Sequence, residues 1–185
     1  MTPGPAVAIE TDAQIIAATV AWLEKAVIGL GLCPFAASVH LRNQIRYRVS
    51  AQESADGLVE DLSEELKLLH DVDPQRCETT LLVHPHVLND FYDYNEFLNA
   101  ADDALQTLEL DGEIQIASFH PQYQFAENAP DDIENYTNRS PYPMLHLLRE
   151  ASITRAVATF PGVHDIGDKN QATLRRLGKA GWQRL

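Results

Sequence analysis

The sequence predicts an α/β domain built on a small, mostly parallel sheet of three strands. Short β-favouring runs at 45–49, 79–83 and 114–118 are separated by segments whose apolar residues recur with a helical period. Strands that alternate with helices are joined by right-handed crossovers, and such connections make the strands parallel. We therefore expect the order α-β-α-β-α-β-loop-α-α, with helices packed on the sheet and one extra short strand possible in the loop. The chain has 185 residues, enough for one domain.

The N-terminal half is expected to contain two helices and one strand. Residues 1–10 contain two prolines and should form a frayed tail, which leaves a single α/β domain at 11–180. T-D-A-Q at 11–14 fits a capping box, and Gly31 ends the first helix. One apolar stripe follows the cap: Ile16, Val20, Leu23, Val27 and Leu30. Alternating residues at 45–49 predict a half-exposed strand, and Ser54 caps a second helix.

The C-terminal half continues the alternation up to a long loop. Residues 79–83 show no polar alternation, which is typical of a strand buried on both faces. Asn89 or Asp90 caps a third helix, and 114–118 forms the third strand. After the loop, Ser140 and Pro141 are expected to open a fourth helix. A last short helix is expected at about 168–177 and is closed by Gly178. The fourth helix would carry its core residues at Met144, Leu147, Leu148 and Ala151.

Charge and composition restrict the partners. The net charge is −13, from 27 acidic and 14 basic residues. This balance argues against nucleic acid and anionic membranes, which bind basic patches. No apolar run approaches the roughly 18 residues of a membrane span, and the first ten residues have no signal-peptide pattern. We expect a cytoplasmic protein whose two cysteines, Cys33 and Cys77, are reduced thiols. The same composition is compatible with a homo-oligomer.

Two histidines mark the ends of predicted strands. His84 follows the run at 79–83, His120 follows the run at 114–118, and each precedes a proline. In open parallel sheets, ligands bind beyond the carboxyl ends of the strands, so we expect both histidines at one edge, covered by the loop 119–140. Imidazole titrates near neutrality and suits proton transfer, which makes both residues catalytic candidates. The alternative for each is a strand-ending histidine bonded to a loop carbonyl.

The loop and the helix after it supply candidate substrate-binding residues. Arg139 precedes the expected helix start, where backbone N–H groups and a guanidinium would bind a carboxylate or phosphate. Asn138 and Tyr136 would position this anion. The alternative is an N-cap by Ser140 with Arg139 at the surface. On the expected helix, His146 shares a face with the charged residues three and four positions after it, and we assign His146 to the same site.

A nucleophile and a metal are further possibilities. Cys33 lies in an exposed-looking turn, but a helix C-terminus raises a thiol pKa unless a cation is near; a small buried hydrophobe is the alternative. A divalent metal could bind His84, His120 and His146, because zinc takes such nitrogen donors. The sequence contains no P-loop, no G-x-G-x-x-G, no G-x-S-x-G and no C-x-x-C.

Five segments of the chain are similar to a known family. They are G-L-C-P-F-A (31–36), E-T-T-L-L-V-H-P (78–85), D-Y-N-E-F-L (93–98), A-S-F-H-P-Q-Y-Q-F-A (117–126) and N-Y-T-N-R-S-P-Y-P-M-L-H-L-L-R-E (135–150). They closely resemble the bacterial family catalogued as domain of unknown function DUF1415. The resemblance extends from the first helix to the last. It implies no activity and no catalytic residues, so the hypothesis about the site depends on the topology.

These features predict a cytoplasmic enzyme that acts on a small anionic metabolite by hydrolysis or group transfer. The alternative is a non-catalytic binding or dimerisation module whose loop aromatics anchor a partner. A deep pocket lined by His84, His120 and Arg139 would favour the enzyme. A flat aromatic surface, with the histidines bonded to carbonyls, would favour the module.

Overall fold

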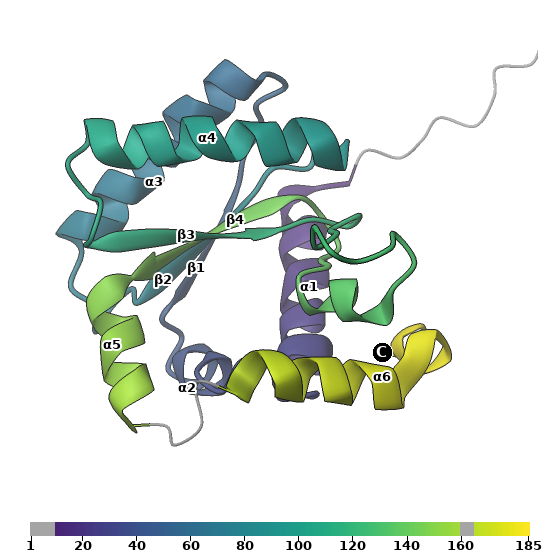
Figure 1. Ribbon diagram of the computed structural model, residues 1–185. Helices are drawn as coiled ribbons and strands as arrows, with labels where there is room; N and C mark the ends of the chain where they lie inside the picture. Colours follow the sequence, from purple (N-terminus) through teal and green to yellow (C-terminus); the bar gives the residue numbers. More distant parts are fainter. Residues whose placement is uncertain (1–9, 160–164) are drawn as a thin grey trace, which may run out of the picture.

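The computed structural model describes residues 10–159 and 165–185. A central sheet separates two layers of helices (Figure 1). Helices α3 (Ala55–Asp71) and α4 (Phe91–Thr107) cover one face. The opposite face carries α1 (Asp12–Trp22), the π-helical turn η1 (Leu23–Ile28), α2 (Ala36–Leu41) and α5 (Glu150–Thr159). Within the described residues, no helix is long and apolar enough to span a membrane.

The sheet has four strands and is mixed. The strands are β1 (Ile45–Val49), β2 (Thr79–Val83), β3 (Ile114–Phe119) and β4 (Met144–Arg149), in the spatial order β1-β2-β4-β3. The first two pair in parallel, and β4 is antiparallel to both β2 and β3. The three expected strands therefore run in the same direction, but β4 separates β2 from β3.

The expected fourth helix from Ser140 is wrong. Residues Met144–Arg149 form β4, and the helix begins only at Glu150. The run M-L-H-L-L-R is apolar at positions compatible with either period, and such short runs cannot be assigned from periodicity alone. Both edges of β4 are hydrogen-bonded, to β2 and β3, and Met144, Leu145 and Leu147 are fully buried. The sheet is thus larger and less parallel than expected.

Most of the expected helix boundaries agree with the structure. Thr11 forms the capping box of α1, Ser54 caps α3 and Asp90 caps α4. The first helix differs in its buried stripe, since Ile15 and Thr19 are buried where Ile16 and Val20 were expected. The last helix, α6 (Ile166–Trp182), is longer than expected and contains a kink at Gly178, where φ is 64°.

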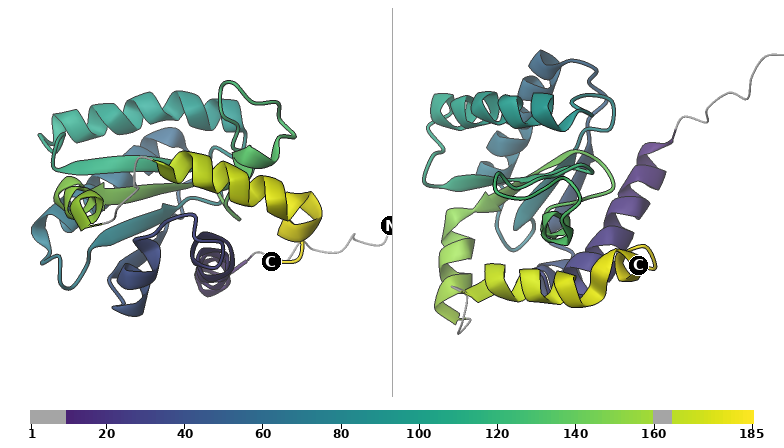
Figure 2. Two further views of the ribbon diagram at one scale, coloured as in Figure 1. Left: turned by 60° about the horizontal axis from the view of Figure 1, so that its bottom comes forward. Right: turned by 45° about the vertical axis from the view of Figure 1, so that its right-hand side comes forward.

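The two faces of the sheet are filled to different degrees. The face under α3 and α4 holds a large core in which Leu58, Leu62, Leu66 and Leu69 are completely buried. The other face has a smaller buried cluster around Ile15, while α2 and α5 contain no buried residue. Figure 2 shows α1 and α2 on the side of the sheet away from α4.

Candidate functional site

His84 and His120 lie together at the carboxyl ends of β2 and β3. Both are fully buried, and the ring of Tyr94 from α4 packs against each, with centroid distances of 5.7 Å to His84 and 5.1 Å to His120. The tyrosine hydroxyl donates to the carbonyl of Met144 at 2.9 Å and accepts from the amide of Phe119 at 3.1 Å. The two histidines therefore share one edge of the sheet.

Both histidines bond to backbone carbonyls. His84 Nδ1 lies 3.0 Å from the oxygen of Val87, and His120 Nε2 lies 3.2 Å from the oxygen of Leu88. His120 Nδ1 accepts from the amide of Gln122. Burial lowers the pKa of His84 to about 4 and also lowers the pKa of His120, so both imidazoles are neutral at pH 7. These contacts hold the turns that follow the two strands.

The loop between β3 and β4 is an ordered structure with its own polar contacts. Arg139 donates to the carbonyls of Tyr123 and Pro130, and its guanidinium stacks 4.4 Å above the ring of Tyr136. Asn138 donates to the carbonyl of Ser118. No helix begins at Ser140, so the expected anion site at a helix N-terminus is wrong in its structural basis. Arg139 therefore connects parts of the loop to one another, and Asn138 joins the loop to β3.

Asn135 is the buried centre of this loop. Its side-chain oxygen accepts from the amide of Phe125 and from the side chain of Asn128, while its Nδ2 donates to the carbonyls of Ala129 and Pro130. The asparagine is fully buried. Sequence reasoning did not single it out, because asparagine is common in loops and nothing local distinguishes this one.

A cavity of about 1040 Å³ lies on the other face of the sheet. Its size is at the upper end of the range for small-molecule sites, roughly 300–1,000 Å³. The floor comes from β2 and β4, and the walls come from η1, the segment 33–36, α2 and α5. Neither His84 nor His120 lines it. The lining includes Trp22, Leu23, Cys33, Phe35, Val39, Arg42, Ile45, Glu78, Thr79, Leu81, Phe119, His146, Leu148, Ile153 and Arg155.

His146 projects from β4 into this cavity and has a defined tautomer. Its Nε2 lies 2.7 Å from the hydroxyl oxygen of Thr79, and that hydroxyl also contacts the carbonyl oxygen of Leu147. A carbonyl can only accept, so the Thr79 proton goes to Leu147 and the imidazole must donate through Nε2. The lone pair is then on Nδ1. This atom has no hydrogen-bond partner among the described residues, and it is not one of the fully buried nitrogens that lack a partner.

The pKa of His146 supports this description. Burial lowers it to about 4, so the ring is neutral at pH 7. The strand period places Arg149 on the opposite face of the sheet, where its guanidinium donates to the carbonyls of Val72 and Cys77. The expectation that His146 and Arg149 share a face is therefore wrong. His146 is therefore neutral at pH 7, and Arg149, the charged residue of the same strand, directs its guanidinium to carbonyls on the other face.

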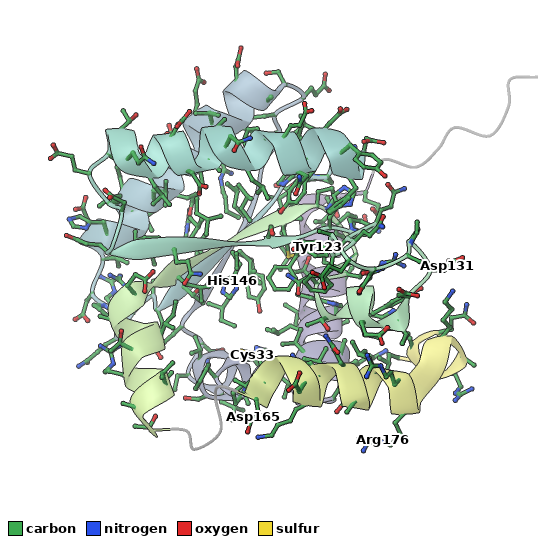
Figure 3. The ribbon with its side chains drawn as sticks, in the orientation of Figure 1. Cys33, Tyr123, Asp131, His146, Asp165 and Arg176 are labelled. Atoms are coloured by element: carbon green, nitrogen blue, oxygen red, sulfur yellow. The ribbon has the colours of Figure 1, made fainter. Side chains whose placement is uncertain are left out.

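Cys33 lies on the cavity wall, across from the sheet. It is a half-buried free thiol in the turn between η1 and α2, and Figure 3 shows it below His146. The buried Asn170 of α6 donates to the carbonyl of Leu32 at 2.9 Å and fixes this turn from the other end of the chain. Gly31, with φ of 68°, lets the chain leave η1 sharply.

The charge of the cavity differs from the charge of the protein. Among the residues that the structure describes, the lining contains three of the 14 basic residues, at Arg42, Arg149 and Arg155, and one of the 27 acidic residues, at Glu78. Arg149 Nη2 binds carbonyls on the far face, which leaves Arg42 and Arg155 on the cavity side. In a chain with a net charge of −13, this is a locally positive site.

The candidate metal ligands do not converge. His84 and His120 lie on the α4 face of the sheet with ring nitrogens bonded to carbonyls, whereas His146 lies on the opposite face. In residues 10–159 and 165–185, no group of three histidine, cysteine or acidic side chains is placed to hold a metal ion.

Sequence reasoning missed Thr79, Arg42, Arg155 and Trp22. We expected Thr79 only as part of a buried strand. Its contact with His146 depends on the register between β2 and β4, which the sequence does not show. Arg42 and Arg155 are 113 positions apart in the chain, and no local pattern connects them. Trp22 donates to the carbonyl of Arg139 and packs 5.5 Å from Phe119, which joins α1 to the cavity wall.

One comparison with known proteins identifies a family. The family model described as "Protein of unknown function (DUF1415)" matches residues 14–184. Every residue that lines the cavity falls inside this range. No curated protein and no solved structure matches the chain. Because the match covers nearly the whole chain, the protein belongs to the DUF1415 family of proteins of unknown function.

Proposed function

We propose that the protein is an enzyme that hydrolyses, or transfers a group from, a small anionic metabolite bound in the cavity, with His146 as general base. One observation carries the proposal: the neutral imidazole of His146 lines a cavity of ligand size, and its Nδ1 has no hydrogen-bond partner among the described residues. General bases must be within hydrogen-bond reach of the proton that they remove. The cavity provides space for a substrate at that nitrogen.

The contacts of His146 suit a base. Nδ1 would remove a proton from an attacking water or substrate hydroxyl, and the ring would become positively charged. Thr79 would stabilise this charge, because its oxygen already accepts from Nε2 and its own proton is held by the carbonyl of Leu147. The same contact keeps the ring in the tautomer that has its lone pair on Nδ1. In histidines generally, the hydrogen bond of one ring nitrogen sets the protonation of the other.

The original candidates His84 and His120 have less support for direct chemistry. Each is fully buried and uses a ring nitrogen to bind a turn carbonyl. In this proposal they hold the edge of the sheet from which β4 starts. The bonding of both histidines to carbonyls is the arrangement expected for the module alternative. Against that alternative, Tyr123, Phe125 and Tyr136 are half-buried and pack against other rings of the same chain, so they do not form an open aromatic surface.

The test compares turnover by wild-type protein and two glutamine variants. His146→Gln keeps a similar volume and removes the base, whereas His86→Gln changes an exposed histidine outside the cavity. Each protein is incubated with p-nitrophenyl acetate, p-nitrophenyl phosphate and a small-molecule cell extract analysed by mass spectrometry. We expect a compound consumed by wild type and by His86→Gln, with a loss of roughly 10²–10⁴-fold in His146→Gln.

Two outcomes would contradict the proposal. One is that wild-type protein consumes no compound in the panel or the extract. The other is that His146→Gln consumes the same compound at the wild-type rate, which would exclude proton transfer through this imidazole. Circular dichroism of the variants controls for folding.

A further inference from the structure

We infer that the cavity ligand is amphiphilic: it has one carboxylate or phosphate group held at the cavity mouth by Arg42 and Arg155, and an aromatic or branched apolar body that lies against the half-buried walls. The inference rests on the proposed function for its choice of cavity, and it adds the class and the orientation of the ligand. It follows from the way exposure, polarity and charge change between the floor and the mouth of the cavity.

The cavity is buried at the sheet and exposed at its outer end. Thr79 and Leu81 are buried at the floor, with exposed fractions of 6% and 3%, and Leu23 on the η1 wall is 5% exposed. Arg42 and Arg155 are exposed. These two arginines therefore lie at the mouth of the cavity, while His146 lies at the sheet. A ligand that meets both has its charged end outward and its reactive bond inward.

The walls between these levels are apolar and incompletely covered. Seven large apolar side chains that line the cavity are half-buried: Trp22, Phe35, Val39, Ile45, Phe119, Leu148 and Ile153. On the opposite face of the same sheet, Leu58, Leu62 and Leu66 of the main core are completely buried. Apolar surface gathered in one concave site favours an apolar ligand, since burial of that surface is the main favourable term in binding. The aromatic rings suit a planar body.

Both arginines at the cavity mouth have N–H groups without a partner among the described residues. Arg42 uses Nε to donate to Gln44 at 2.6 Å, and its two terminal nitrogens have no partner among the described residues. Arg155 uses Nη2 for Glu78 at 3.2 Å and Ser152 at 2.8 Å. Its other nitrogens have no partner in residues 10–159 and 165–185. Guanidinium groups bind carboxylate and phosphate oxygens through two such N–H groups.

The balance of charge favours a single anionic group. Glu78 already compensates Arg155 in part, through the ion pair at 3.2 Å. Arg42 and Arg155 together with Glu78 leave one net positive charge at the mouth, whereas the whole chain carries −13. A ligand with several anionic groups would be repelled by the protein at long range, and a neutral ligand would gain nothing from the arginines. Because Glu78 compensates Arg155 in part, Arg42 should contribute more than Arg155 to the affinity for the anionic group.

The experiment measures affinity by isothermal titration calorimetry for three compounds with the same ring system. They are 1-naphthylacetate, 1-naphthyl phosphate and the neutral 1-naphthylacetamide. We expect at least one of the two anions to bind about tenfold more tightly than the amide, and the better one identifies the head group. The advantage should disappear in the double variant Arg42→Gln, Arg155→Gln. It should persist in Arg176→Gln, which removes an exposed arginine of α6 that Figure 3 shows away from His146 and Cys33.

Cys33 reports where the compounds bind. Cys33 is half-buried on the cavity wall and Cys77 is buried, so N-ethylmaleimide should modify Cys33 first. A bound naphthyl anion should slow this modification in proportion to occupancy. Three outcomes overturn the inference: no compound binds at millimolar concentration, the amide binds as tightly as both anions, or binding leaves Cys33 modification unchanged. An equal loss of affinity in Arg176→Gln would also overturn it, since the effect would then be one of net charge.

The result can be separated from a failure of the catalytic proposal. His146→Gln should bind the preferred anion like wild type, because Gln keeps the volume and the rim is unchanged. If the protein prefers an anion but turnover does not depend on His146, the ligand class is supported and the role of His146 as general base is refuted. If turnover depends on His146 but no anion is preferred, the general base is supported and the ligand class is refuted.

Discussion

At the scale of single residues, the pair of Thr79 and His146 is the feature with the most chemical content. A hydroxyl that must donate to one group and accept from the other leaves the imidazole a single neutral tautomer. The ring of Phe119 from β3 lies beside the same imidazole, with 6.2 Å between the centroids. Two residues from different strands therefore define which nitrogen of His146 can act.

We predict that Thr79→Val changes the tautomer of His146 and reduces turnover. Valine has the shape of threonine but cannot accept from Nε2, so the Nε2–H form loses its preference. Leaving a buried polar group without a partner costs about 1–3 kcal/mol, which chemical denaturation would detect. Nitrogen NMR of the imidazole should show a mixture of tautomers in Thr79→Val and a single form in wild type and in Thr79→Ser. An unchanged spectrum in Thr79→Val would refute the assignment.

At the scale of elements, β4 and the loop before it decide the architecture. The strand lies between β2 and β3, and its alternation gives His146 to the cavity and Leu145 and Leu147 to the main core. Local sequence is compatible with a helix there, because Met144, Leu147 and Leu148 have the spacing of a helical stripe as well as lying in a short apolar run that suits a strand. The hydrogen bonds of two neighbouring strands, which are distant in sequence, resolve the ambiguity.

The loop between β3 and β4 should depend on Asn135 for its order. We predict that Asn135→Ala removes four hydrogen bonds and makes residues 120–143 a site of cleavage in limited proteolysis, while the sheet stays folded. Asn99→Ala, on the exposed side of α4, is the matched control and should be as resistant as wild type. Equal resistance of both variants would mean that Arg139 and the stacked rings hold the loop without Asn135.

At the scale of the whole molecule, three histidines whose pKa values are lowered by burial make stability depend on pH. Burial lowers the pKa values of His84 and His146 to about 4 and also lowers that of His120. The unfolded chain binds protons at about 6.5, and so it takes up more protons than the native state between pH 6.5 and 4. The free energy of unfolding is then highest above pH 6.5 and decreases as pH falls toward 4.

We predict that urea denaturation at pH 7.5, 6 and 4.5 shows this loss, with His84 and His146 each contributing at most about 3 kcal/mol by pH 4. Replacement of His146 by Gln should reduce the slope with pH, because one titrating group is removed. His86→Gln should leave it unchanged, since that side chain is exposed. The same dependence of stability on pH in His146→Gln and in wild type would show that the pKa of His146 is not lowered in the folded protein.

The sequence by itself determined the α/β class, the three strands that run in one direction, the caps at Thr11, Ser54 and Asp90, and the shared edge of His84 and His120. These are consequences of local periodicity, of capping chemistry and of right-handed crossovers, which act over short stretches of chain. Only the tertiary structure decided that 144–149 is a central strand, that His146 faces away from the other two histidines, and that Cys33, Arg42, Thr79 and Arg155 surround one cavity. The physical reason is that register and burial depend on contacts between residues far apart in sequence, and no local pattern records them.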